Sequence, residues 1–198
     1  MGKKRREERV VKRETFASKQ QHQKKKNTLM ALGVLAIVAS IVVYASYIFV
    51  TTEGTAIGAP PNAGSLGDEH EHASMLTMIH GDRFDYASPA FQVKTTWIHF
   101  ERQDGATVHR HASGVDLAYL FNSLSIGLDK ECFIFPDGKQ FCTNDDYSLK
   151  FYINHKLVPD ITEYVIQEND RILISYGGDT EEQINEQLTL LDAQPILS

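Results

Sequence analysis

The chain has 198 residues and a formal net charge of −6, which leaves room for one domain of ordinary size and accessory segments. Residues 1–26 carry eleven Lys or Arg against three acidic residues, whereas the rest of the chain carries nine against twenty-three. A basic arm and an acidic body separated by an apolar segment are typical of a membrane protein, so we expect the lipid bilayer, and no nucleic acid, as a partner.

The sequence motifs indicate no enzyme class. The chain contains no phosphate loop, no dinucleotide fingerprint, no nucleophile elbow and no HExxH motif. We therefore expect a protein without catalytic residues.

Residues 27–50 form an uncharged, predominantly apolar run of 24 residues. About 20 such residues cross the hydrocarbon layer as a helix, the only reasonable conformation for a single segment in lipid. Because the basic residues 24–26 precede the run, the positive-inside rule places the 1–26 arm in the cytoplasm and the later residues outside. A cleaved signal peptide fits less well, because its apolar core is about 7–15 residues long.

Residues 51–69 are rich in Gly, Ala, Pro and Thr, a composition that predicts a flexible linker. The extracytoplasmic domain is then expected over residues 70–178, followed by an amphipathic helix and tail over residues 179–198. Thr180 and Gln183 have the spacing of a capping box at the start of this helix. Its apolar stripe consists of Ile184, Leu188 and Leu191.

Two hairpins are predicted in the first half of the domain. Residues 73–86 contain two short strands around a turn at residues 80–82. In the second hairpin, a long extended run over residues 91–101 is followed by a turn at Asp104-Gly105 and a return strand that ends at Ala112.

One principal helix is predicted next. Ser113 and Asp116 resemble a capping box, and Gly127 is expected to end the helix as a left-handed cap. The apolar residues at helical spacing are Leu117, Leu120, Phe121 and Leu124.

Residues 131–142 predict a further hairpin, because Pro136-Asp137-Gly138 suits a type I turn followed by a glycine bulge. This register pairs Cys132 with Cys142 at a non-hydrogen-bonded position, where Cα atoms lie about 4.5 Å apart. A disulfide tolerates that distance, so we expect a structural cross-strand disulfide outside the membrane.

The remaining predicted strands cover residues 149–154 and 172–176, with turns at residues 154–156 and 169–170. Hairpins before one principal helix, followed by a closing apolar strand, indicate an α+β domain with a β-grasp-like arrangement.

The histidines of the central hairpin share one face only in one register. If the loop has three residues, 103–105, then His99 pairs with His109 and Trp97 with His111. A two-residue loop, Asp104-Gly105, would instead place Phe100 opposite His109. Apolar and polar side chains would then share a face, because a slip of one residue moves every side chain to the other face. We therefore predict that His99, His109 and His111 share one face.

Directly opposed Cβ atoms in a sheet are about 4.5–5.5 Å apart, so neighbouring imidazoles could converge on one ion. Neutral imidazole suits zinc and copper. The alternative is a structural or contact role, since histidines on half-exposed sheets are often only solvated. The candidate metal ligands are His99, His109, His111, His70, His72 and Glu101.

The order of HEHA, WIHFERQDGATVHRHA, the paired Cys132 and Cys142, LKFYIN and DRILISYG resembles a family of membrane-anchored, histidine-rich extracytoplasmic proteins of ammonia-oxidising archaea. More distant relatives occur among actinobacteria, and the family is uncharacterised. Some similar chains are labelled disulfide isomerase, but this chain lacks the CxxC motif that such catalysis ordinarily uses. The resemblance favours copper over zinc.

Three functions are consistent with these features. The first is a single-pass, outward-facing accessory module that binds a transition metal through the histidine face. The second is a non-catalytic interaction module of a membrane or envelope complex. The third is a thiol–disulfide oxidoreductase that uses the two cysteines.

Overall fold

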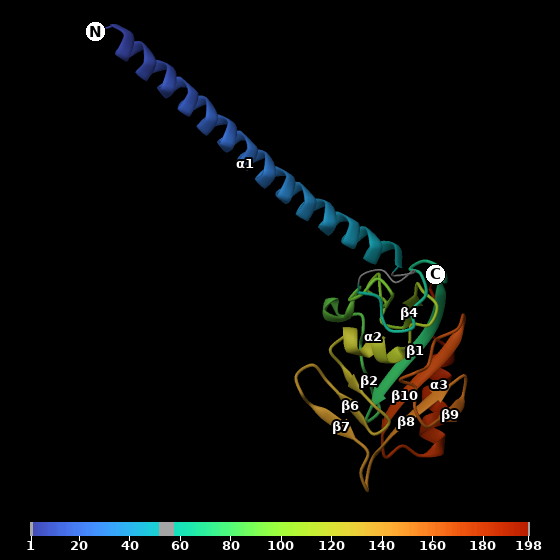
Figure 1. Cartoon of the computed structure of the whole chain (residues 1–198). Coiled ribbons are helices and arrows are strands. Elements are labelled where there is room, and N and C mark those ends of the chain that lie inside the picture. Colours follow the sequence, from blue (N-terminus) through green and yellow to red (C-terminus); the bar gives the residue numbers. More distant parts are fainter. Residues whose placement is uncertain (1, 52–57, 198) are drawn as a thin grey trace. The chain divides into compact units, whose positions relative to one another are not determined.

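The structure is a computed structural model that describes residues 2–51 and 58–197, with side chains described for residues 19–48 and 58–197. The chain divides into a helical unit, Met1–Glu53, and a β-rich unit, Gly54–Ser198 (Figure 1). We describe the two units separately.

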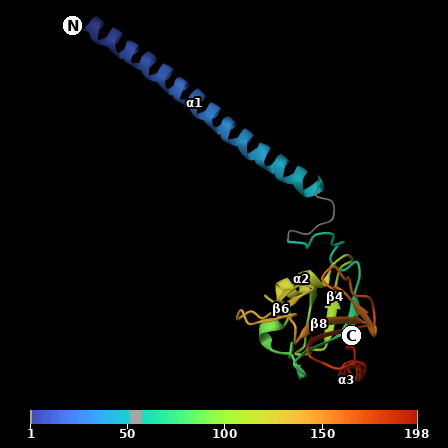
Figure 2. The ribbon, with the colours of Figure 1, turned by 90° about the horizontal axis from the view of Figure 1, so that it is seen from below.

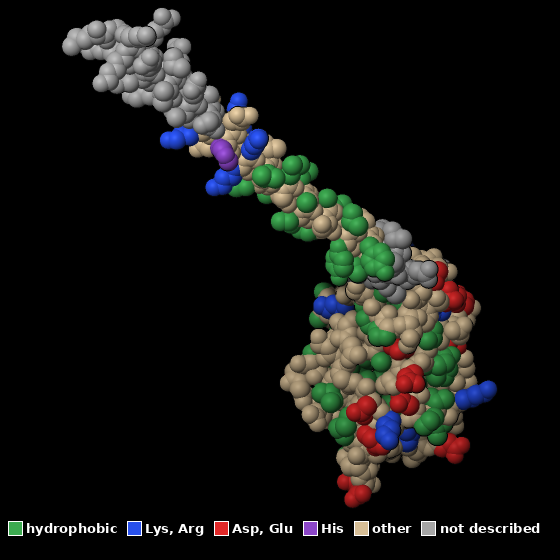
Figure 3. Space-filling model, in the orientation of Figure 1, with side chains coloured by type: hydrophobic (Ala, Val, Ile, Leu, Met, Phe, Trp, Pro, Cys, Tyr) green, Lys and Arg blue, Asp and Glu red, His purple; other side chains and the backbone are tan. Residues whose placement is uncertain are grey.

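The helical unit is one helix, α1, which runs from Gly2 to Thr51. Its Lys19–Ile48 part is long and apolar enough to cross a membrane, a property that a signal sequence would share. Blue lysine and arginine side chains are followed along it by green apolar side chains in Figure 3. The helix also includes the basic arm. Residues 3–32 contain neither Gly nor Pro, so nothing in the arm interrupts the helix.

The β-rich unit is built around a parallel pair of strands, β1 (Glu71–Ile79) and β10 (Asp170–Gly177). Their register runs from Ala73 opposite Asp170 to Ile79 opposite Tyr176. Both strands are almost entirely buried, as expected for central strands that are covered on both faces. This pair brings together two segments that lie nearly one hundred residues apart in the sequence.

The other strands of this seven-stranded sheet pair antiparallel, in the order β3-β4-β1-β10-β8-β9, with β2 also paired to β1. The expected hairpin around residues 80–82 is present. Outside the central pair the strands are β2 (Asp82–Arg83), β3 (Ile98–His99), β4 (Thr107–Arg110), β8 (Ser148–Ile153) and β9 (Lys156–Val158).

Two helices cover opposite faces of this sheet, α2 (Leu117–Ser123) and α3 (Glu181–Asp192) (Figure 2). The main core lies on the α2 side, whereas the α3 stripe packs on Leu76, Met78 and Leu173. Thr180 and Gln183 form the expected capping box of α3. The expected α+β class, with one long apolar helix and a β-rich domain with two further helices, is confirmed.

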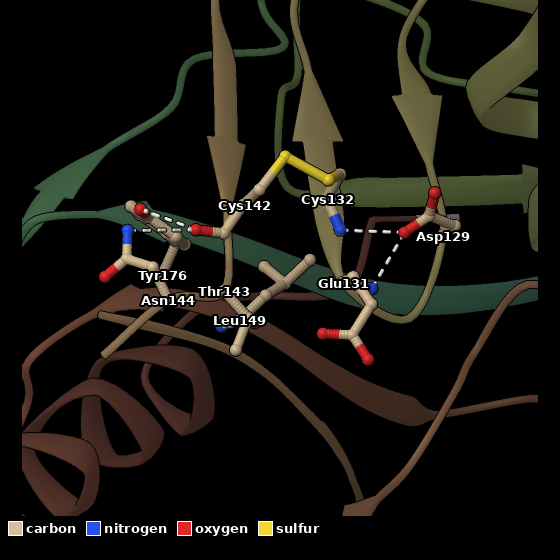
Figure 4. The surroundings of a disulfide bond; sticks show 8 residues. All are labelled: Asp129, Glu131, Cys132, Cys142, Thr143, Asn144, Leu149 and Tyr176. Carbon is tan, nitrogen blue, oxygen red and sulfur yellow. Dashed lines mark hydrogen bonds between the residues drawn. A yellow bond between two sulfur atoms is a disulfide. The ribbon is translucent and has the colours of Figure 1, made fainter. Parts of the chain in front are cut away.

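A small second sheet contains β5 (Gly127–Leu128), β6 (Cys132–Ile134) and β7 (Gln140–Cys142). The predicted hairpin register is confirmed, and the Cys132–Cys142 disulfide joins β6 to β7 with a Cα–Cα distance of 4.1 Å. The Asp129 side chain accepts hydrogen bonds from the backbone N–H groups of Glu131 and Cys132, and the Tyr176 hydroxyl donates to the Cys142 carbonyl (Figure 4).

The prediction of a long extended run over residues 91–101 is wrong. A 3₁₀ turn, η1 (Pro89–Phe91), is followed by an irregular segment, and only Ile98–His99 forms strand β3. Gln92 is the physical reason, since its side chain bonds the Tyr86 and Asp104 carbonyls and so holds this segment in a loop.

The expected caps of α2 are also wrong. Asp116, rather than Ser113, is the N-cap and accepts the Tyr119 N–H. Ser113 instead hydrogen-bonds Asp68. After the helix, Ser125 takes the left-handed conformation with φ 59°, while Gly127 begins β5.

Part of the expected linker contacts the domain. Ala63 is buried, Gly64 donates its N–H to the Ser113 carbonyl, and Gly67 donates to the His111 carbonyl. Small residues allow this close approach, since a Cβ at Gly64 would meet Ser113 Oγ at 2.1 Å. Residues 58–69 therefore form an ordered approach to β1, while residues 52–57 lie outside the described part of the chain.

Candidate metal centre

Three histidines form a row across three neighbouring strands. On β3 and β4, His99 lies opposite His109, so the register predicted from the apolar pattern is confirmed. On the other side of β4, His72 of β1 lies opposite His109 as well. The row His99–His109–His72 therefore runs across the sheet with His109 in the centre.

A second row lies beside the first, just beyond the strand ends. It contains His70 and His111, whose ring centroids are 4.4 Å apart. His70 is also 4.6 Å from His72, and His111 is 4.9 Å from His99, both between ring centroids. The structure thus brings all five predicted histidines together. We call these five residues and Glu101 the histidine cluster.

The first row is buried and the second is more accessible. His72, His99 and His109 are 8%, 6% and 3% exposed, whereas His70 is exposed and His111 is half-buried. Solvent therefore reaches the cluster from the side of the second row. Buried polar side chains need partners, and the partners of this row define its chemistry.

The partner of His72 is Glu168. One carboxylate oxygen of Glu168 lies 3.2 Å from His72 Nδ1 and also accepts the His72 backbone N–H at 2.7 Å. Since a carboxylate accepts and does not donate, Nδ1 carries a hydrogen, and when the ring is neutral Nε2 carries the lone pair. This buried Nε2 has no hydrogen-bond partner among the described residues.

The partner of His99 is the backbone. Its Nδ1 lies 2.7 Å from the Thr95 carbonyl oxygen, which can only accept, so the hydrogen is again on Nδ1. His99 Nε2 then faces a carboxylate oxygen of Glu101 at 3.5 Å. The other Glu101 oxygen lies 3.9 Å from His109 Nε2 and 3.3 Å from Arg102 Nε.

The protonation states suit metal binding at neutral pH. Burial lowers the pKa of His109 from 6.5 to about 4, and burial likewise lowers the pKa of His111. Burial alone would raise the pKa of Glu101, but the charges of His109 and Arg102, together with the hydrogen bond and charge of His99, outweigh it and the pKa is lowered. Neutral imidazoles and an ionised carboxylate are the forms that bind metals.

Three of the histidines have the geometry of a ligand set. One ring nitrogen from each of His70, His72 and His109 lies within 4.8 Å of the others. In a zinc site each ligand nitrogen lies about 2.0–2.1 Å from the ion. Rotation of the rings would bring the three nitrogens closer to one another, as a shared ion requires. These three side chains could hold a metal ion, whose identity the geometry does not specify.

Arg110 positions the segments that carry the site. It is fully buried, and its guanidinium group donates to the carbonyls of Ile166 and Ala112 and to the Glu69 carboxylate. Glu69 precedes His70, and Ile166 lies two residues before Glu168. Arg110 therefore fixes both chain segments beside the first row.

Sequence reasoning missed the supporting groups Glu168, Arg110 and Thr95. Glu168 reaches His72 because β10 runs parallel to β1, a pairing with no local signal in the sequence. Arg110 alternates with the histidines of β4, so its strand position was predicted but not its burial. Comparison with known proteins gave no match among family models, curated proteins or solved structures.

Proposed function

We propose that the protein is a single-pass, membrane-anchored extracytoplasmic module whose histidine cluster binds a transition metal ion, copper or zinc, for handling or for structure. The observation that carries the metal proposal is the buried Nε2 of His72, which has no hydrogen-bond partner among the described residues and lies beside two further imidazoles. A lone pair that has lost its water and gained no hydrogen bond is costly, and a bound cation would remove that cost.

The second coordination sphere supports the same proposal. Metal-binding histidines ordinarily donate their other ring N–H to a carboxylate or a backbone carbonyl. His72 does the first through Glu168, and His99 does the second through Thr95. Both rings are therefore held through Nδ1, which leaves Nε2 as the ligand atom.

The location proposal rests on charge and on cysteine chemistry. The apolar part of α1 follows a basic segment, which favours an N-terminus in the cytoplasm. The two cysteines of the chain are joined as a disulfide, and disulfides persist in oxidising compartments.

The proposed fold is β-grasp-like. The strand order β4-β1-β10-β8-β9, with its parallel central pair, supports this comparison. Membership of the archaeal family is also part of this proposal and favours copper over zinc.

The test is metal binding by the full chain in detergent micelles, purified with a tag that contains no histidine. After removal of metal with a chelator, the protein is dialysed against buffered Zn²⁺ or Cu²⁺, and bound metal is counted by elemental analysis. We expect at least one ion per chain, and loss of the tightest-bound ion in His72→Ala and His109→Ala.

The matched control is His155→Ala, an exposed histidine outside the cluster that contacts Asp192. This variant should bind as much metal as the wild-type protein. Much less than one ion per chain in the wild-type protein, or equal binding in all variants that circular dichroism shows to be folded, would overturn the metal proposal.

The interaction-module alternative needs a surface other than the α3 stripe. Ile184, Leu188 and Leu191 pack on the sheet, so they are not available to a partner. The oxidoreductase alternative rests on the Cys132–Cys142 disulfide alone.

A further inference from the structure

The histidine cluster contains more donors than one ion uses. Its five imidazoles and the Glu101 carboxylate make six ligands, whereas zinc sites in proteins are almost always four-coordinate. We propose that the cluster binds two transition-metal ions bridged by Glu101. This inference rests on the proposed metal-binding function and adds a second ion to it.

The donors fall into two sets. The first set is His70, His72 and His109, whose ligand atoms lie within 4.8 Å of one another. The second set is the remaining pair, His99 and His111, whose ring centroids are 4.9 Å apart. The sets adjoin at one edge, where the centroids of His70 and His111 are 4.4 Å apart, and lie farther apart on the His109 side, where the centroids of His99 and His111 are 6.1 and 6.4 Å from that of His109.

Glu101 touches both sets with different oxygens. Its Oε2 lies 3.5 Å from His99 Nε2, and its Oε1 lies 3.9 Å from His109 Nε2. A carboxylate with one oxygen toward each ion bridges them and offsets part of their mutual repulsion. Two-metal sites in proteins hold their ions about 3.5–4 Å apart, a spacing that such a bridge allows.

The orientation of His99 places a donor atom of the second set beside this carboxylate. Its Nδ1 lies 2.7 Å from the Thr95 carbonyl oxygen, which leaves Nε2 on the side of Glu101. Metal-binding histidines are ordinarily held in this way, with the other ring nitrogen bonded to a backbone carbonyl or a carboxylate.

The test is the stoichiometry of Zn²⁺ binding to the full chain in detergent micelles, measured by competition with a chromogenic chelator and by native mass spectrometry. We expect two ions per wild-type chain and one ion in His99→Ala. Glu101→Gln, which preserves shape and removes the bridging charge, should weaken the second ion by at least about tenfold. His155→Ala should keep two ions.

A second readout uses Cu²⁺. At two ions per chain, the electron paramagnetic resonance spectrum should show dipolar coupling between neighbouring Cu²⁺ ions, and this coupling should disappear in Glu101→Gln. Glu101 is more exposed than His99, so Glu101→Gln should disturb the fold less. It therefore still tests the second ion if His99→Ala fails to fold.

The outcomes separate the two proposals. One ion per wild-type chain overturns the two-ion inference and leaves the metal-binding function standing. No ion overturns both. Two ions that are both lost in His99→Ala while the protein stays folded would also overturn the division into two sets.

Discussion

Glu168 fixes the tautomer of His72 through a single carboxylate oxygen. Removing this partner would free the ring to rotate and would lower its basicity, and such changes typically cost about 10–100-fold in metal affinity. We therefore expect Glu168→Ala to weaken Zn²⁺ binding by about that factor, as measured by competition with a chelator.

The control for this variant is Glu163→Ala, which removes an exposed carboxylate in the same loop. It should bind Zn²⁺ as the wild-type protein does. Equal affinities for the Glu168 and Glu163 variants would show that the carboxylate has no part in binding.

Arg110 combines complete burial with three acceptors, the Glu69 carboxylate and the carbonyls of Ile166 and Ala112. Arg110→Met would leave buried carbonyls without donors, at about 1–3 kcal/mol for each unsatisfied group. We expect urea denaturation to show a loss of roughly 2–4 kcal/mol in the free energy of unfolding.

Arg83→Met is the matched control, because Arg83 is an exposed residue of β2. Its effect should stay within about 0.5 kcal/mol. If Arg110→Met were equally mild, water or another donor would have to satisfy these carbonyls.

At the scale of elements, the β6–β7 hairpin is held by a disulfide that closes a short loop. Replacing both cysteines with alanine should lower the free energy of unfolding by about 2–3 kcal/mol in the chain-entropy treatment. Zn²⁺ stoichiometry should be unchanged, because the hairpin belongs to the second sheet and the cluster to the first.

The same hairpin tests the oxidoreductase alternative. A structural disulfide should stay unlabelled when the native protein is treated with mild reductant and an alkylating agent, then analysed by intact mass. Ready labelling of both cysteines without loss of structure would favour a redox role.

The elements differ in how far the sequence predicts them. Hairpin registers could be predicted because they depend on local sequence, namely on a turn such as Pro136-Asp137-Gly138 and on the alternating apolar pattern beside it. The β1–β10 pairing was not, since parallel strands have no connecting turn that marks their register. The irregular segment before β3 was missed for a related reason, because Gln92 makes its tertiary hydrogen bonds only in the folded chain.

The candidate site follows the same rule. His99, His109 and His111 could be assigned to one face from the central hairpin alone. That His70 and His72 complete the cluster depends on β1 pairing with β4, and that Glu168 supports it depends on β1 pairing with β10. Local patterns therefore predicted the histidines of the cluster better than the groups that orient them.

At the scale of the whole molecule, the question is whether α1 is retained. A transmembrane anchor would keep residues 1–50 attached, whereas a signal sequence would be removed. We expect membranes extracted at alkaline pH to retain the protein and its intact mass to include the first 50 residues. A shorter, extractable form would establish cleavage and would remove the anchor from the proposal.

The orientation has its own measurement. Protease added to the outer side of sealed cells should degrade the β-rich unit and spare the basic arm. Degradation of the arm alone would reverse the proposed topology.

The single tryptophan of the chain gives the cluster an optical consequence. Trp97 is buried, lies two residues before His99, and accepts the backbone N–H of His111 with its carbonyl. Paramagnetic Cu²⁺ bound in the histidine cluster should quench the tryptophan fluorescence, while d¹⁰ Zn²⁺ should leave most of the emission intact. The intensity at one emission wavelength would then distinguish copper from zinc, and Zn²⁺ added before Cu²⁺ would protect the signal if both ions occupy the same donors.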